Sequence, residues 1–175
     1  MPAAPSPRRS TRSGAPEGGA ALALALGGRL PLPEAELRRI VGTVVAAEGA
    51  RAEISLTFLG REAMRRLNLE HKGRDRPTDV LSWSLPDPRG FIVGDVYVCP
   101  WAARQEAAAR GIPAHEELVR LVVHGTLHAL GWDHPEEAGR TRSPMWRRQE
   151  RYVRRLAPAP DGPARPVRQR REGRR

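Results

Sequence analysis

The segment HGTLHALGWDH, residues 124–134, comes directly after the apolar run 118–123. The apolar register of the run continues into the segment, which predicts a mostly buried helix at the centre of the fold. His124 and His128 are four residues apart, so they lie on one face of that helix. Two imidazoles on a buried helix are the starting point for everything else that the sequence predicts.

Gly131 suits the end of this helix, because glycine adopts the left-handed backbone conformation in which a chain turns back. The turn 131–133 can then bring His134 to the same point in space as His124 and His128. Three imidazoles that leave a fourth position for water form a catalytic rather than a structural zinc site. The segment therefore predicts a site for one zinc ion.

A single histidine in an apolar helix is usually an ordinary core or surface residue, and a pair four apart can arise by chance. Here three of the chain's five histidines fall within residues 124–134, and a glycine stands where the backbone must reverse. The spacing and the number of ligands favour metal binding over both ordinary interpretations.

The 175 residues are enough for one domain with a real core, and their formal net charge is +10. Lys72 is the one lysine of the chain, so a general bias towards arginine explains part of this charge. Cys99 is the one cysteine, which excludes an internal disulfide. We expect it to be a small buried residue in a reducing, cytoplasmic compartment.

Residues 1–20 and 158–175 are rich in proline and arginine and poor in bulky apolar side chains. Such segments cannot bury enough surface to offset their ordering entropy, so both are predicted to be disordered tails around a domain at 21–157. The tails carry +2 and +4 of the net +10, which leaves about +4 for the domain. That charge alone does not indicate a nucleic-acid-binding protein.

The apolar run 20–26 follows three arginines and so resembles a targeting signal. It is too short to span a bilayer and at the lower limit for a signal-peptide core, so we expect no membrane partner. Its alternation of alanine and leucine is more typical of a first strand.

The remaining hydrophobic patterns predict a small α+β or α/β domain, in which helices pack around one mixed β-sheet of about four strands. The predicted strands are 20–26, 53–59, 79–85 and 91–99, of which the last two form a hairpin around the turn 86–90. The predicted helices are 33–47, 61–69, 104–110, the central metal-bearing helix from near Pro113, and 144–156.

The spacing His-xxx-His-xx-Gly-xx-His equals that of the metzincin peptidases, but Gly125 stands where those enzymes need a glutamate as general base. A bound zinc ion lowers the pKa of its water to about 7, so hydroxide forms at neutral pH without a dedicated base. The missing glutamate therefore argues against a peptidase but not against hydrolysis.

A second informative stretch holds His71, Lys72, Arg74 and Arg76, a predicted cationic loop that is suited to phosphate. A solvated loop explains the same cluster equally well. Further along, Asp95 interrupts an apolar strand. A buried carboxylate needs partners, so Asp95 is expected to be either a second-shell acceptor near the metal or, slightly favoured, a structural hydrogen-bonding group.

Together, HGTLHALGWDH, the earlier motifs N-x(5)-R-D-R-PTDVLSW and GDVYVC, and the later Met145 and Glu150 closely resemble the YbeY family of bacterial rRNA maturation factors. The resemblance covers about residues 22–157. It implies a zinc-dependent endoribonuclease specific for single strands, which acts in 16S rRNA 3′-end maturation, rRNA processing and ribosome quality control. It also implies ribosomal RNA and the small ribosomal subunit as partners, and His124, His128 and His134 as the metal ligands.

The family usually has an arginine where this chain has Lys72. Lysine keeps the charge but loses the two-pronged grip on phosphate, which Arg74 is placed to take over. Lys72 and Arg74 are therefore the predicted catalytic cations, and both join Arg76 as predicted RNA contacts. Asp133 is expected to orient a ligand imidazole, although capping of the turn is an equal alternative.

Two other functions remain open at this stage. One is a non-catalytic ribosome-assembly factor whose zinc only stabilises the fold, and a fourth protein ligand to the metal would favour it. The other is a metzincin-like peptidase, which would need a general base other than the missing glutamate.

Overall fold

The computed structural model describes residues 21–87, 90–135 and 139–157. The predicted disordered tails lie outside this part of the chain. The described residues form, in order, β1 (Leu22–Gly28), α1 (Glu34–Ala47), β2 (Arg51–Phe58), α2 (Arg61–Lys72), β3 (Val80–Pro86), β4 (Phe91–Val98), α3 (Pro100–Arg110), α4 (Ala114–Ala129), the short 3₁₀ helix η1 (Arg140–Arg142) and α5 (Pro144–Leu156).

The four strands form one mixed sheet in the order β1-β2-β4-β3. Strands β1, β2 and β4 are parallel, and β3 pairs antiparallel with β4. The predicted mixed sheet and its hairpin are therefore confirmed, although residues 88 and 89 of the predicted turn lie outside the described residues.

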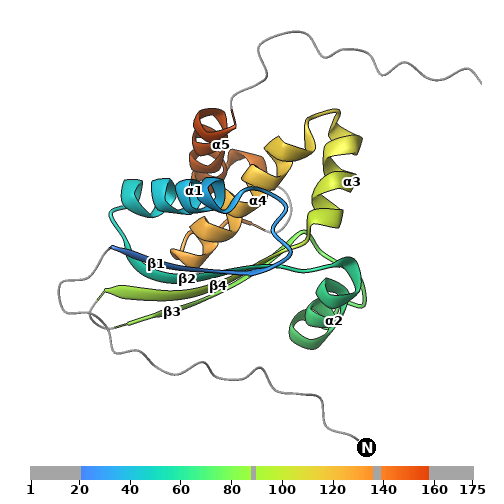
Figure 1. Ribbon diagram of the computed structural model, residues 1–175, viewed down its shortest axis with the longest axis horizontal. Helices are drawn as coiled ribbons and strands as arrows, with labels where there is room; N and C mark the ends of the chain where they lie inside the picture. Colours follow the sequence, from blue (N-terminus) through green and yellow to red (C-terminus); the bar gives the residue numbers. More distant parts are fainter. Residues whose placement is uncertain (1–20, 88–89, 136–138, 158–175) are drawn as a thin grey trace, which may run out of the picture.

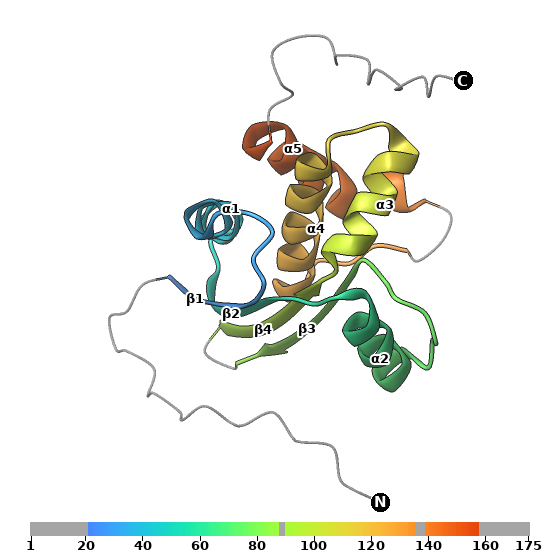
Figure 2. The same ribbon diagram turned by 45° about the vertical axis from the view of Figure 1, so that its right-hand side comes forward.

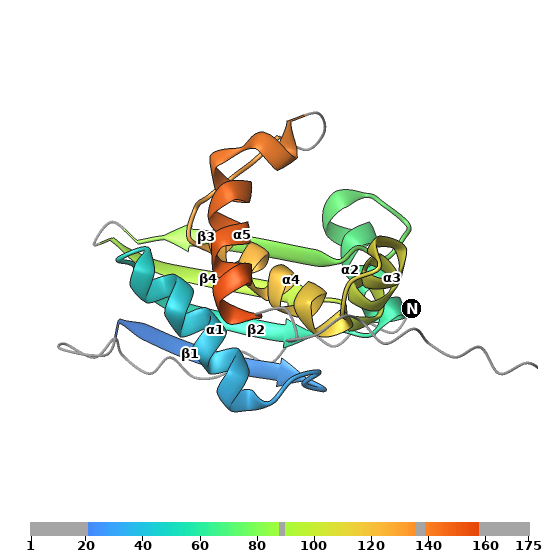
Figure 3. The same cartoon turned by 90° about the horizontal axis from the view of Figure 1, so that it is seen from above.

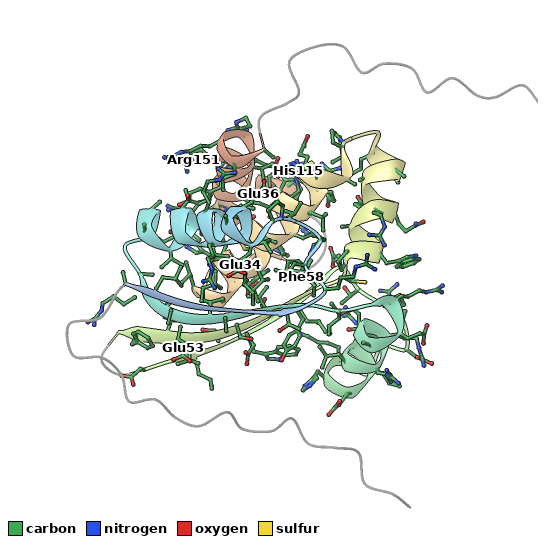
Figure 4. All side chains as sticks on the ribbon, in the orientation of Figure 1. Glu34, Glu36, Glu53, Phe58, His115 and Arg151 are labelled. Atoms are coloured by element: carbon green, nitrogen blue, oxygen red, sulfur yellow. The ribbon has the colours of Figure 1, made fainter. Side chains whose placement is uncertain are left out.

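Buried and exposed residues alternate along β2, so the sheet has one face towards the core and one that is more exposed. Ile54, Leu56 and Phe58 are buried, whereas Glu53 is exposed. Figure 4 shows Phe58 on the side of the sheet that carries most of the helices and Glu53 on the other side. The main core lies on the Phe58 side, where strand residues meet the apolar stripe of α1 and the apolar residues of α4 from Leu118 onwards.

Helices α1, α3, α4 and α5 cover one face of the sheet, and α2 lies against the other (Figure 1). Figure 2 shows the same separation from a second direction. The packing agrees, because Val96 belongs to the main core, whereas its neighbour Tyr97 packs with Met64 of α2 in a smaller second cluster. Buried Cys99 belongs to this second cluster.

Helix α4 is the centre of the larger layer, in contact with α1, α3, α5, β3 and β4. Figure 3 looks down on this layer and shows α4 between α1 and α3, with α5 on its outer side. Two glycines allow α4 to lie very close to the sheet. A Cβ on Gly125 would lie 2.4 Å from Cγ1 of Val96, and one on Gly94 would lie 2.8 Å from Cβ of Ala129.

The main differences from the predicted boundaries concern helix ends. α3 begins at Pro100 rather than at residue 104, because proline at the first helical position is preorganised for a helix. α2 continues to Lys72, so His71 and Lys72 lie in its last turn and not in a loop as predicted. No helix of the described residues is long and apolar enough to cross a membrane.

Candidate metal centre

The end of α4 brings the three histidines together. The helix ends at Ala129, and Gly131 then adopts a φ of 90°, the left-handed conformation predicted for the reversal. The backbone N–H of Trp132 donates to the carbonyl oxygen of Leu127 at 3.0 Å. This bond closes the turn and directs His134 back towards the last turn of the helix.

The three Nε2 atoms form a small triangle. Nε2 of His128 lies 3.1 Å from that of His124 and 3.3 Å from that of His134, and the third side measures 3.4 Å. Three corners of a tetrahedron around an ion at about 2.0–2.1 Å lie roughly 3.3–3.4 Å apart. The predicted convergence of the rings is therefore confirmed, and the three side chains lie close enough to hold one metal ion.

The opposite side of each ring is held by a second partner. Nδ1 of His124 donates to Oε1 of Gln149 at 2.7 Å, and Nδ1 of His134 donates to the carbonyl oxygen of Pro135 at 2.9 Å. His128 makes a hydrogen bond with the backbone of Trp132. A proton fixed on Nδ1 leaves the lone pair on Nε2, so the contacts of His124 and His134 prepare these rings to bind a metal.

The site also favours the neutral form of two of its histidines, His124 and His128. Burial, aided by the nearby charges of His128 and Arg140, lowers the pKa of His124 to about 4. Burial and the neighbouring His134 lower the pKa of His128 as well. A metal binds the neutral imidazole, so neither ring needs to release a proton at neutral pH before it binds the ion.

Gln149 is itself fixed by a buried ionic network. Its Nε2 donates to Oε1 of Glu150 at 2.9 Å, and the buried Arg120 binds Glu150, Glu116 and Glu117. Burial alone would raise the pKa of Glu150, but the bonds from Arg120 and Gln149 outweigh it and hold this pKa below its usual value. The amide of Gln149 therefore has one preferred orientation, with its oxygen towards His124.

A second cluster anchors the turn. The carboxylate of Glu48 accepts hydrogen bonds from Nε1 of Trp132 at 3.0 Å, from Nη1 of Arg148 at 2.9 Å and from the hydroxyl of Tyr152 at 2.5 Å. The guanidinium of Arg148 lies 4.2 Å from the centre of the Trp132 ring. Burial and the Glu48 carboxylate raise the pKa of Tyr152 to about 12. Residue 132, two positions before the third histidine, is thereby tied to both α1 and α5.

Asp133 and Asp95, which were both considered as hydrogen-bond partners near the metal, have different surroundings. Oδ1 of Asp133 accepts the backbone N–H of His134 at 2.8 Å but lies 3.9 Å from Nδ1 of His128, too far for a hydrogen bond. Asp133 therefore caps the turn. The prediction of a buried Asp95 is wrong, because its side chain is exposed. Strand alternation places it on the face of the sheet that α4 does not cover.

The predicted cations come from the end of α2 and from the segment that leads to β3. Lys72 ends α2, which packs on the opposite face of the sheet, and Arg74 and Arg76 follow it on the way to β3. All three residues are exposed. The backbone around them is held, because Nδ2 of the buried Asn68 donates to the carbonyl oxygen of Arg76 at 2.7 Å.

Gln149 and Glu48 were not predicted from the sequence. Gln149 carried a usable signal, since it interrupts the buried stripe of α5 formed by Met145, Val153 and Leu156. A polar residue at a core position needs a buried partner. Glu48 carried no such signal, because its partners are 84 to 104 residues away in the chain.

Known proteins are similar to this chain in sequence and in fold. The family model described as "Endoribonuclease YbeY" matches residues 30–157. Proteins named "Endoribonuclease YbeY" include one from Desulfitobacterium hafniense that is 40% identical over 119 residues, covering 62% of this chain and 74% of the relative. Another, from Chromohalobacter salexigens, is 36% identical over 109 residues, covering 59% and 71%. The solution structure of TM1509 from Thermotoga maritima superposes with a TM-score of 0.54 at 27% identity, covering 76% of this chain and 88% of that one.

Proposed function

The chain belongs to the YbeY endoribonuclease family, and on that premise we propose that it is a zinc-dependent endoribonuclease that cuts single-stranded RNA. The observation that carries the proposal is the triangle of Nε2 atoms with sides of 3.1, 3.3 and 3.4 Å. We take residues 21–157 as the domain that performs this activity in the cytoplasm.

His124, His128 and His134 would hold the ion. Zinc suits three neutral imidazoles, and three protein ligands are typical of catalytic rather than structural sites. When bound, the ion supplies Lewis acidity for a phosphodiester oxygen and lowers the pKa of a coordinated water to about 7. Within the described residues the triad gathers no fourth protein ligand, which favours a catalytic site over one that only stabilises the fold.

The protein contributes positioning and charge. Gln149 fixes the ring of His124, and the turn from Gly131 to Asp133 places His134. Lys72 and Arg74 would steady the phosphate as negative charge builds up in the transition state, and Arg76 would contact the RNA next to them. The physiological substrate that we propose is the 3′ end of 16S rRNA, together with rRNA processing and quality control on the small subunit.

The absence of the metzincin glutamate has a packing reason. The helix lies so close to β3 and β4 at Gly125 that a Cβ would also come within 3.1 Å of Cγ2 of Val80. A glutamate therefore has no room at this position. The same contact argues against the peptidase alternative.

The test removes one proposed metal ligand and compares the variant with a matched control. We expect His128→Ala to lose bound zinc and to cut a single-stranded RNA at least about 1,000-fold more slowly than the wild type. The control is His115→Ala on the same helix, whose exposed ring binds Glu36 at 2.8 Å (Figure 4). That variant should retain zinc and activity.

Three results would count against the proposal. Undiminished cleavage by metal-free His128→Ala would end the metal-dependent mechanism. A zinc-loaded wild type that cuts neither free RNA nor pre-16S rRNA in small subunits would favour the assembly factor. Equal cleavage of single-stranded and duplex RNA would contradict the single-strand preference.

A further inference from the structure

A pocket of about 250 Å³ lies beside the histidine triad. Its walls come from α3, α4, α5, η1 and the residue before β3, and they include Asp79, His124, Arg140, Trp146 and Gln149. His124 belongs both to the wall of the pocket and to the triad. Neither His128 nor His134 lines it. A group bound in this pocket would therefore lie against the ring of His124, one of the three rings proposed to hold the metal.

Arg140 is the unsatisfied member of the pocket. Its Nε is buried and has no hydrogen-bond partner. No described carboxylate forms an ion pair with it, although its guanidinium lies 5.8 Å from the centre of the Trp146 ring. A buried donor without an acceptor costs about 1–3 kcal/mol, and more when the group is charged. Each such group in a native structure needs an explanation, and an acceptor that is supplied from outside is one of them.

Apart from Arg140 and Glu106, the charged residues of the pocket have partners of their own. Arg110 and Arg120 both bind Glu117, at 2.9 and 2.7 Å. The carboxylate of Asp79 accepts hydrogen bonds from the hydroxyl of Thr78 and the backbone N–H of Val80. Glu106, on α3, is exposed. Arg140 is therefore the cation of the pocket for which the described residues supply no ion-pair partner and whose Nε lacks an acceptor.

We infer that Arg140 binds a phosphodiester group of single-stranded RNA in this pocket, next to the bond that is cut. The inference rests on the proposed function and adds a substrate contact to it. A guanidinium presents parallel N–H groups that match two phosphate oxygens. Neither Lys72 nor Arg74 lines the pocket, so Arg140 would hold a different phosphate from the one that these two residues would steady during cleavage.

The experiment compares two neighbouring arginines in the full-length, zinc-loaded protein. Arg140→Gln and Arg142→Gln make the same charge change on η1, but Arg142 is exposed and does not line the pocket. The probe is a single-stranded 2′-O-methyl oligonucleotide, whose binding is followed by fluorescence anisotropy at several salt concentrations. Cleavage of single-stranded RNA, bound zinc and the melting temperature are measured on the same samples.

We expect Arg140→Gln to bind the probe about tenfold more weakly and to cut RNA about 100-fold more slowly, with unchanged zinc. The salt dependence of its binding should fall by about one phosphate contact. Arg142→Gln should stay within about twofold of the wild type. Arg140→Lys keeps the charge but loses the parallel N–H groups of the guanidinium, so its affinity should lie between those of the wild type and Arg140→Gln.

Equal binding and cleavage by the Arg140 and Arg142 variants would overturn the inference while leaving the proposed function intact. A zinc-loaded wild type that does not cut RNA would overturn the proposed function, and the binding comparison would still decide the role of Arg140. If Arg140→Gln does not fold, Arg140→Lys decides, and wild-type binding by that variant would contradict the inference.

Discussion

The end of α4 and the end of α2 both carry residues that the proposed function uses, but they hold them differently. Around His124 the side chains are buried, and ring nitrogens, amide and carboxylates form continuous hydrogen bonds back to Arg120. After α2, the backbone is held by Asn68, whereas the side chains of Lys72 and Arg76 are exposed. The contacts around His124 fix the positions of side-chain atoms, whereas the contact after α2 fixes only the backbone.

This difference separates two kinds of contribution to catalysis. A metal site needs its donor atoms within a few tenths of an ångström, so its ligands need supporting contacts. Exposed cations act over longer distances and tolerate movement, but each contributes less because water screens it. Substitutions at the end of α4 should therefore have large effects on zinc binding and stability. Substitutions at the end of α2 and just after it should have small effects, limited to the binding and cleavage of RNA.

The largest difference between the two regions should come from placing glutamate at a glycine. Gly125→Glu puts a charge where a Cβ alone would lie 2.4 Å from Val96. Gly60→Glu places the same residue at the start of α2, where a Cβ meets nothing within 4 Å. We expect the first to lose more than about 4 kcal/mol of unfolding free energy and the second less than about 0.5 kcal/mol. Similar denaturant midpoints for the two variants would contradict the close approach of α4 to the sheet.

A smaller but more specific loss should follow from Gln149→Leu. This variant removes the acceptor of His124 Nδ1, and loss of such a partner typically weakens metal binding about 10–100-fold. A competition titration with a zinc chelator measures the change, and Gln105→Leu on the surface of α3 is the control. Wild-type zinc affinity in Gln149→Leu would show that the ring of His124 needs no support.

The anchor at Glu48 predicts a dependence on pH. Burial by itself would raise the pKa of Glu48, but hydrogen bonds from Tyr152 and Arg148 and the charge of Arg148 hold it below the usual 4.5. A lowered native pKa stabilises the fold above the unfolded pKa, and this stability is lost as the pH falls through the native value. We expect Glu48→Gln to cost about 1–2 kcal/mol at pH 7.

That difference should shrink as the pH falls below about 4.5, the range in which the carboxylate of the wild type takes up its proton. Urea unfolding of both proteins between pH 7 and pH 3 measures it. A difference that is constant over this range would mean that the charge of Glu48 does not contribute.

The smallest effect is expected for Lys72→Ala. Because this side chain is exposed and Arg74 would remain to steady the phosphate, its removal should weaken RNA binding and slow cleavage only about two- to threefold each. Zinc content and melting temperature should stay unchanged. Lys72→Arg should restore or slightly improve binding through its paired donors. A loss of cleavage as large as that of His128→Ala would erase the contrast between the two regions and make this lysine a principal catalytic group.

The same contrast explains what the sequence alone could predict. The convergence of the three histidines follows from local rules, namely helical spacing and a glycine turn, so it was predicted correctly. The supports of the site come from remote segments, such as Glu48 for Trp132, and no local pattern encodes them. Asp95 was misjudged because a charged residue in an apolar strand was taken as buried, although only one face of that strand is covered near it.

The order in which the chain is synthesised gives α5 a further importance. Arg148, Gln149 and Tyr152 all lie on this helix, which a ribosome makes after the histidines. A growing chain that ends before α5 has the three rings but lacks Gln149, the partner of His124, and the two α5 side chains that bind Glu48. If the protein cuts ribosomal RNA as proposed, an unfinished chain should therefore have little nuclease activity towards the ribosome that is synthesising it.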